Sequence, residues 1–394
     1  MVGVILILLW FGVVFDPVGS FFSLNKILLA PIFMLYLIDG LRLKTTSSDR
    51  KLAVVFVIVS MSIFLVLYGL IVAQIRGGLR QEFIDTSYIA SAIYLMVTIT
   101  YLRPSNLKWS MNGMVLSLNC LSLLVIYTYF AYWNGYTLDL LYFLVEKGVL
   151  YLGVREYAGF EIPYVYYIAS PVISIVACKA VSDYLKEGSF FCLIQAIIPT
   201  AALCLTGVRT AQICGFVILG VVLFHKNKKI FTAALFFATL IIGVEATQVV
   251  FAMFDSTDHS NATKLEYLPV YGEMFADAVT FLFGQGFNAH TWNAEFSSLI
   301  TTDGASKVEL TYLELLRVYG VIFGVILLLI GLILPLGYLK SNEREFEWLY
   351  YGMILFLFSS ALNPYLFSGT GMLALGLVLG VCINSDVRTS ACKL

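Results

Sequence analysis

The chain has 394 residues, of which 60% are hydrophobic and 12% are charged, and its formal net charge is −1. A soluble globular domain is about half apolar and about a quarter charged, so the composition excludes an ordinary soluble domain. The near-zero net charge gives no overall field that would attract nucleic acid. We therefore expect no nucleic-acid partner.

Runs of about twenty apolar residues, each long enough to cross a bilayer as a helix, recur along the whole chain. Because backbone groups in lipid must be satisfied within a segment, we predict an all-α polytopic membrane protein. It forms a single integral membrane domain over residues 1–394. We expect about twelve transmembrane helices, at residues 2–15, 21–41, 52–74, 86–102, 111–131, 162–181, 189–206, 210–225, 230–252, 311–339, 348–367 and 369–385. The first run lacks a basic leader and a cleavage site, which predicts a retained span.

The lysines and arginines of the connecting loops fall mostly on one side of this arrangement. By the positive-inside rule that side is cytoplasmic, and both termini lie there. The opposite, periplasmic side has two long loops, 132–161 and 253–310. The first mixes apolar and charged residues at helical spacing, which predicts a helix lying at the interface. The second is the most polar region, so any chemistry is expected on this face.

Cysteine and carboxylate spacing gives no sign of a bound metal. Seven cysteines are present, none of them in the long polar loops and none in a CxxC pair. Disulfides and metal sites are therefore not expected. Carboxylates in the outer loops are spread out, and no cofactor is expected.

Several basic residues lie on the predicted outer side, where the rule disfavours them. Arg209 stands in "CLTGVRTAQICG", a short turn between two apolar runs, and either reaches to water or serves a site. Arg76 and Arg80, in "QIRGGLRQEF", are candidates to bind a lipid diphosphate. The alternative for this pair is that their side chains extend to the interface without binding anything.

The stretch "SKVELTYLELLRVYG" carries three charges at the start of a strongly apolar run. A continuous helix from Glu309 would place them at or above the outer membrane boundary, because residues 318–339 alone are long enough to cross the bilayer. Glu314 and Arg317 form an i,i+3 pair. This ionic stripe faces either a cavity or the outer loop; alternatively, it is a solvated helix end with a weak surface ion pair.

The segment "FLFGQGFNAH" precedes that helix. His290 is a candidate general base, although a single loop histidine is more often only polar surface. Gly284 and Gly286 lack the GxGxxG spacing and the strand–helix context of a phosphate loop. We expect them to form a turn.

Four short motifs together resemble a known family. They are the turn "GVRT", the loop "FLFGQGF", the helix "ELTYLELLRVYGVIFG" and the late segment "NPYLFSGTG". Over roughly residues 205–371 they resemble the bacterial O-antigen polymerase family (Wzy type), a relative of the O-antigen ligases. The resemblance implies a multi-pass protein of the bacterial inner membrane that acts in lipopolysaccharide or related polysaccharide biosynthesis.

The resemblance also implies a reaction. A glycosyltransferase-type polymerase would join undecaprenyl-diphosphate-linked oligosaccharide repeat units at the outer face of the membrane, without a metal. Its partners would be these glycans, membrane lipids, a chain-length regulator protein and a flippase. Glu309 is the expected base, with His290 behind it; ligases usually have histidine where Glu309 stands. The predicted substrate-binding residues are Arg209, Arg317, Lys264, Arg76, Arg80, Glu314 and Tyr312.

Two other functions remain open at this point, an O-antigen ligase and a flippase or transporter of lipid-linked oligosaccharides. Transporters often contain internal repeats and helices that are broken near the membrane midplane. The sequence has no obvious repeat, and its polarity lies at one face. This favours an enzyme that works on the outer side.

Overall fold

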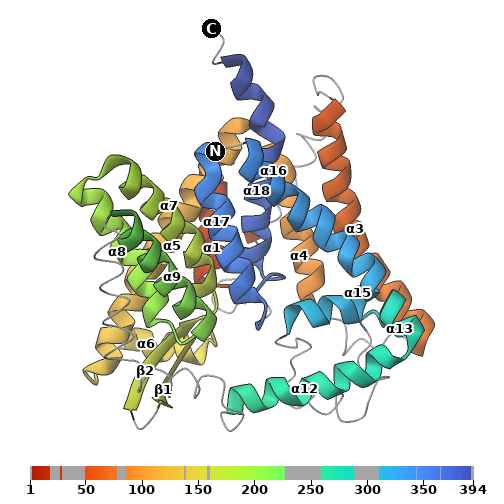
Figure 1. The fold of residues 1–394 in the computed structure, drawn as a ribbon, viewed down its shortest axis with the longest axis horizontal. Coiled ribbons are helices and arrows are strands. Elements are labelled where there is room, and N and C mark those ends of the chain that lie inside the picture. Colours follow the sequence, from red (N-terminus) through yellow and green to blue (C-terminus); the bar gives the residue numbers. More distant parts are fainter. Residues whose placement is uncertain are drawn as a thin grey trace.

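The computed structural model describes residues 2–17, 27–28, 49–77, 86–136, 139–157, 160–226, 259–287, 310–342, 344–363 and 365–391. Within these ranges the chain is mostly helical (Figure 1). The helices are α1 (Val2–Phe15), α3 (Asp49–Gly77), α4 (Thr86–Val97), η2 (Thr98–Leu102), α5 (Pro104–Trp133), α6 (Asp139–Glu146), η3 (Ser170–Val172), α7 (Ile173–Glu187), α8 (Phe190–Leu205), α9 (Arg209–Lys226), α12 (His259–Ala276), α13 (Ala278–Phe283), α15 (Thr311–Leu328), η4 (Leu329–Ile333), α16 (Leu334–Asn342), η5 (Arg344–Phe346), α17 (Glu347–Ser360) and α18 (Gly369–Ala391). The strands are β1 (Leu150–Tyr157) and β2 (Phe160–Tyr167).

Among the described residues, three helical stretches are long and apolar enough to cross a membrane. They are Leu52–Arg76, Pro104–Trp133 and Thr311–Ser341. The outward faces of such helices are also apolar: on α3, Phe56 is 71% exposed and Ile75 is 77% exposed. A helix that is apolar on all sides is typical of a lipid environment. These features indicate a helical membrane protein, as the composition predicts.

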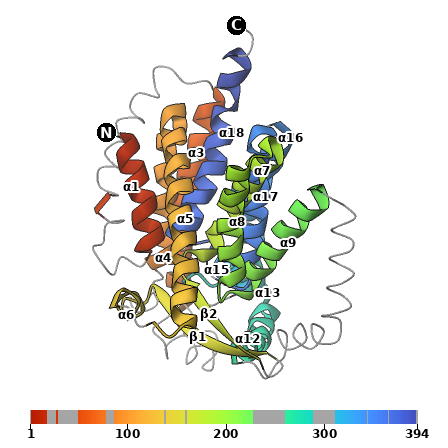
Figure 2. The ribbon, with the colours of Figure 1, turned by 90° about the vertical axis from the view of Figure 1, so that its left-hand side faces the viewer.

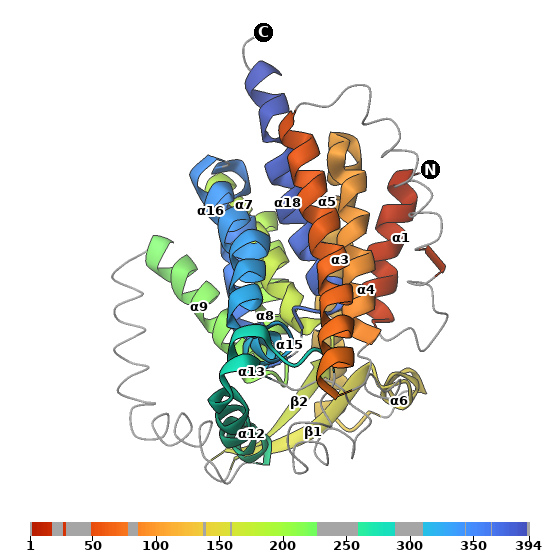
Figure 3. The same cartoon turned by 90° about the vertical axis from the view of Figure 1, so that its right-hand side faces the viewer.

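The centre of the bundle is α18. Residues 370–384 are all buried, and α1, α3, α4, α5 and α17 surround this helix (Figures 2 and 3). Glycines allow the close approach: an added Cβ would lie 2.0 Å from Thr98 at Gly376 and 2.9 Å from Tyr101 at Gly380. Small residues of this kind let neighbouring helices pack tightly in a membrane.

The elements from both long loops lie at one end of the bundle. Helix α6, the antiparallel hairpin β1–β2 and α12 are all at the lower end in Figure 1. Helix α1 begins and α18 ends towards the opposite end (Figure 2). We call these the hairpin end and the terminal end. The described parts of the two long loops thus lie at the end of the bundle opposite to the start of α1 and the end of α18.

Two predictions in this region need correction. The loop 132–161 contains a helix, α6, as expected, but it also holds β1, and the expected span at 162–181 begins with β2. The two strands pair along their whole length, with Leu150 opposite Tyr167 at one end and Tyr157 opposite Phe160 at the other. The expected span therefore starts only with α7, because residues up to Tyr167 form a strand.

The helix at 311–339 is not continuous, contrary to expectation. Gly320 has φ 69° and ψ 172°, a conformation that breaks α15 between Tyr319 and Val321. In Figure 1 the first part of α15 lies across the hairpin end, and the remainder rises next to α3. A short π-helical segment, η4, follows further along. The charged start of α15 is thus folded into the protein.

Candidate functional site

The loop "FLFGQGF" lies between α3 and α15. The backbone N–H of Gln285 donates to the carbonyl of Arg317 (2.7 Å), and that of Gly286 donates to the carbonyl of Val318 (3.1 Å). On the other side, the N–H of Phe287 donates to the carbonyl of Gly69 in α3 (3.1 Å). The break in α15 exposes these carbonyls to the loop, so the loop replaces hydrogen bonds that a straight helix would make.

Glycine is required at this junction. Gly284 has φ 75° and Gly320 has φ 69°. A Cβ on Gly284 would lie 2.5 Å from the Gly320 nitrogen, and a Cβ on Gly320 would lie 2.3 Å from the Leu282 carbonyl oxygen. The two glycines therefore let the two backbones touch. The turn predicted at Gly284 and Gly286 begins at Gly286, and Gly284 is the C-cap that ends α13.

Glu314 and Arg317 form the predicted i,i+3 pair, and the pair is buried. Glu314 is 5% exposed and Arg317 is 3% exposed. The Arg317 Nε donates to Glu314 Oε2 (2.7 Å), and its Nη2 donates to Glu314 Oε1. Its Nη1 donates to the Gly286 carbonyl (2.9 Å). The alternative of a solvated helix end is therefore wrong.

Helix α12 contributes a second partner for this carboxylate. The Tyr271 hydroxyl donates to Glu314 Oε2 (3.0 Å), and the ring is 2% exposed. Burial, reinforced by the Glu314 carboxylate, raises the pKa of Tyr271 well above its ordinary value, so the phenol stays protonated and keeps donating. Leu310 is buried against Tyr267, Tyr271 and Met274. Together these contacts fasten α12 to the start of α15.

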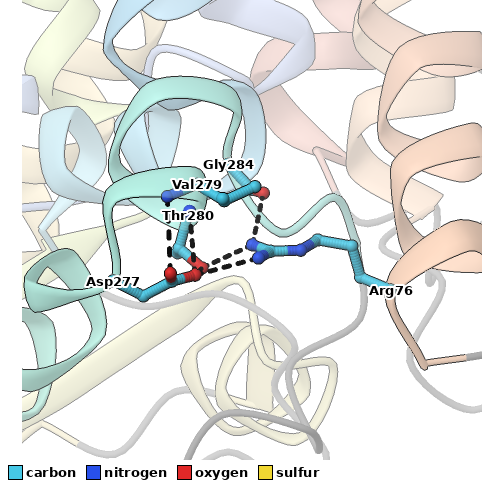
Figure 4. Close-up of polar contacts among 5 residues, drawn as sticks. All are labelled: Arg76, Asp277, Val279, Thr280 and Gly284. Atoms are coloured by element: carbon cyan, nitrogen blue, oxygen red, sulfur yellow. Dashed lines mark hydrogen bonds and ion pairs between the residues drawn. The ribbon is translucent and has the colours of Figure 1, made fainter.

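Arg76, at the end of α3, holds the other side of the same loop (Figure 4). Its Nη2 forms an ion pair with Asp277 Oδ2 (2.9 Å), and its Nη1 donates to the Gly284 carbonyl (3.1 Å) and to Thr280 Oγ1. The predicted alternative, a side chain reaching the interface without a partner, does not describe this arginine. Arg76 is 24% exposed, and part of it faces solvent.

Asp277 begins α13 as its N-cap. Its carboxylate accepts from the backbone N–H of Thr280 (3.0 Å) and from the Thr280 hydroxyl (2.6 Å). These hydrogen bonds, with that from Arg76, hold the pKa of Asp277 below its ordinary range. The carboxylate is half exposed and stays charged, so it remains a fixed anion opposite Arg76.

The turn that carries Arg209 lies on the hairpin and on α17. The Gly207 N–H donates to the Val165 carbonyl of β2 (2.9 Å). The Thr210 hydroxyl bonds to Ser359 of α17 (3.0 Å). Arg209 is half-buried and has interactions of its own. This turn is thus placed by a strand and a helix distant from it in sequence.

The start of α15 rests on the last turns of α17 and on the segment that follows it. The Thr311 hydroxyl donates to the Asn363 carbonyl (2.6 Å), and the Tyr312 hydroxyl donates to the Leu357 carbonyl (2.9 Å). The Tyr312 hydroxyl is therefore used within the protein. Both the Arg209 turn and the start of α15 contact the end of α17.

Other predicted site residues cannot be placed in the same way. Glu309, His290 and Arg80 lie outside the described residues. Lys264 belongs to α12, one turn before Tyr267, and its side chain lies outside the described part. The described site therefore brings together Arg76, Glu314, Arg317 and Tyr312 around one loop and the end of α17.

Sequence reasoning missed Tyr271, Asp277 and Gly69. The signal for Asp277 was present, because Asp-x-x-Thr before an apolar stretch is typical of a helix N-cap. Tyr271 and Gly69 carry no local signal, since their roles depend on contacts with residues far away in the chain. In the described part of the chain, no group of three histidine, cysteine or acidic residues could hold a metal ion.

Comparison of the chain with family models, with curated proteins and with solved structures returns no match.

Proposed function

We propose that the protein polymerises undecaprenyl-diphosphate-linked oligosaccharide repeat units at the outer face of the bacterial inner membrane. One observation carries the proposal: the four motifs that resemble O-antigen polymerases, far apart in sequence, converge at the hairpin end. The "FLFGQGF" loop bonds to Arg317, the start of α15 bonds to Asn363 of "NPYLFSGTG", and the "GVRT" turn bonds to the end of α17.

The proposed reaction is a glycosyl transfer. Glu309 accepts the proton of the acceptor hydroxyl, and that oxygen bonds to the anomeric carbon of the donor. The bond from this carbon to the phosphate oxygen breaks, and the undecaprenyl diphosphate leaves with the electron pair. Arginine suits the departing diphosphate because its planar guanidinium offers several donors.

The contacts divide the predicted residues into two groups. Arg317 and Glu314 are positioning residues, since their hydrogen-bonding groups are used inside the protein and nearly no surface remains. They fix the start of α15 directly after Glu309. Arg209 and the exposed part of Arg76 are the proposed diphosphate contacts, with Lys264 and Arg80 as further cations and His290 as the reserve base. Tyr312 serves to position the same helix.

A complementation assay tests the proposal. Arg209→Ala and Glu309→Gln are expressed in a polymerase-deletion strain at matched protein levels, and the glycan ladder is read on a gel. We expect both variants to give single repeat units only. Lys147→Ala, which removes a cation at the same end of the bundle, serves as the control and should give full ladders. Full ladders from both site variants would refute the assignment.

A transporter of the same lipid-linked sugars is a second candidate, and the break in α15 favours it. Broken helices often form the substrate sites of transporters. The same deletion strain separates the two functions. If the lipid-linked units fail to reach the outer leaflet without the protein, transport is the function; if they reach it and stay unpolymerised, the transferase is correct. If the deletion strain still attaches single repeat units to lipid A, another protein performs that ligation, and the ligase alternative is excluded.

A further inference from the structure

A separate cavity lies at the terminal end, away from the site described above. Its volume is about 650 Å³, within the range of small-molecule pockets. It is enclosed by the start of α5, the end of α7, the segment that leads into α17, and the last buried turn of α18. Nothing in the proposed transfer reaction uses this cavity.

The charges that line the cavity are mixed, with an excess of lysine. They are Lys108, Lys179, Lys186, Asp183 and Glu345. Lys179 is already paired with Asp183 (2.6 Å) and lies over the Trp348 ring (5.9 Å). Lys108 and Lys186 are exposed, and Glu345 is the remaining carboxylate among these lining residues.

The start of α5 adds to the positive character of the same wall. Pro104 is its first residue, and its N-cap, Arg103, makes no side-chain capping bond. The positive end of the helix dipole therefore faces the cavity next to Ser105 and Lys108. Lysines together with a helix N-terminus favour a phosphate group.

Asn384 on α18 forms part of the inner wall of the cavity. It lines the cavity and is only 8% exposed. Its Nδ2 donates to the carbonyls of Tyr101 (2.6 Å) and Gly380 (2.9 Å), which fixes the orientation of the amide. Its Oδ1 has no hydrogen-bond partner among the described residues. This oxygen has almost no accessible surface, so the charged groups of the cavity wall, and not Asn384, are what a ligand would meet.

We propose that this cavity binds the phosphate group of an anionic glycerophospholipid headgroup. The phosphate contacts Lys108 in the first turns of α5 and Lys186 in the last turn of α7. Basic pockets between helix ends on the cytoplasmic side are a general way of binding such headgroups. The positive-inside prediction places the terminal end on that side.

Thermal unfolding of the full-length protein in lipid nanodiscs tests the proposal. Wild type is compared in phosphatidylcholine alone and in phosphatidylcholine with added phosphatidylglycerol. We expect phosphatidylglycerol to raise the Tm, because a ligand that binds only the folded state stabilises it. Lys108→Gln/Lys186→Gln should lose more than half of that rise and keep its Tm in phosphatidylcholine, since both side chains are exposed. Lys340→Gln, an exposed lysine at the same end outside the cavity, should keep the full rise.

Three outcomes would overturn the proposal. An unchanged rise in the double variant, or an equal loss in Lys340→Gln, would show a general surface effect of anionic lipid. An equal, lysine-dependent rise with soluble glycerol phosphate in phosphatidylcholine nanodiscs would show a free phosphate ligand and refute the lipid source.

Discussion

At the scale of single residues, the most constrained position is Gly320, where α15 breaks. Its conformation is one that glycine alone adopts readily, and an L-residue there costs about 1–3 kcal/mol. The clash of an added Cβ with the Leu282 carbonyl adds to this cost. Gly320→Ala should therefore lower the free energy of unfolding by at least about 1–3 kcal/mol, as measured by thermal or denaturant unfolding in detergent.

Gly337→Ala is the matched control for that measurement. Gly337 lies in α16, has no positive φ, and an added Cβ there has no neighbour within 4 Å. We expect it to leave stability unchanged or slightly raised, since alanine is the better helix former. Equal stabilities for the two variants would show that the break in α15 does not depend on glycine.

The Glu314–Arg317 pair should show strong coupling. Arg317→Leu leaves a buried carboxylate without its counter-charge, which costs about 3–5 kcal/mol. Glu314→Leu/Arg317→Leu removes both charges and should be more stable than Arg317→Leu alone. A double-mutant cycle on the free energy of unfolding measures this. Simple additivity of the two single changes would contradict the buried pair.

Asp277 should make the stability of the folded protein decrease at acidic pH. Because its folded-state pKa lies below that of an ordinary aspartate, the charged form stabilises the fold above about pH 4. That stabilisation begins to be lost as the pH falls below about 4, the pKa of an ordinary aspartate, and it is gone once the pH has passed below the pKa of Asp277 in the folded state. Unfolding midpoints between pH 6 and pH 3 should therefore fall less steeply for Asp277→Asn than for wild type. Asp139→Asn, at the exposed start of α6, is the control and should follow wild type.

At the scale of elements, the sequence predicted the regular helices well. The expected spans 2–15, 189–206 and 210–225 differ from α1, α8 and α9 by at most one residue at either end. These segments are strongly apolar runs that stop at polar residues or turns, so hydropathy alone predicts them as helices, although they are shorter than the three stretches long enough to cross a membrane. Contacts with other parts of the chain did not have to be known.

The hairpin and the break in α15 were missed for the opposite reason. Residues 162–167 are apolar enough to extend the next helix, and only pairing with β1 makes them a strand. Gly320 stands in an apolar run that reads as one helix, and only the "FLFGQGF" loop accounts for its conformation. Likewise, spacing predicted the Glu314–Arg317 pair, whereas its burial depends on Tyr271 and Gly286.

The hairpin should control the Arg209 turn through Tyr164. Its ring fills the space beside two glycines, where an added Cβ would lie 2.6 Å from it at Gly153 and 2.3 Å at Gly207. Tyr164→Ala should therefore loosen the turn and shorten the glycan ladder, and Tyr164→Phe should restore it. Tyr136→Ala, at an exposed position of the same end, is the control. A full ladder with Tyr164→Ala would show that the contact between the hairpin and the Arg209 turn is not needed for function.

At the scale of the whole molecule, the arrangement of ends makes a direct prediction about topology. Tyr136 follows α5, which ends at the hairpin end, and Lys186 belongs to the last turn of α7, which ends at the terminal end (Figure 2). Both side chains are exposed. Single cysteines at these positions, in a background without the native cysteines, should react with a membrane-impermeant maleimide from opposite sides. Tyr136→Cys should label in intact cells and Lys186→Cys only after permeabilisation. Labelling of both from one side would contradict the predicted orientation.

The position of α18 in the chain has a consequence for assembly in the membrane. This helix is buried on every side, yet it follows all the helices that pack around it. Those helices enter the bilayer before their shared partner exists, with polar groups such as Ser91, Thr98 and Thr100 not yet covered by it. The bundle therefore closes only after α18 has been synthesised, and its central packing is a step that follows insertion of the surrounding helices rather than one that proceeds span by span.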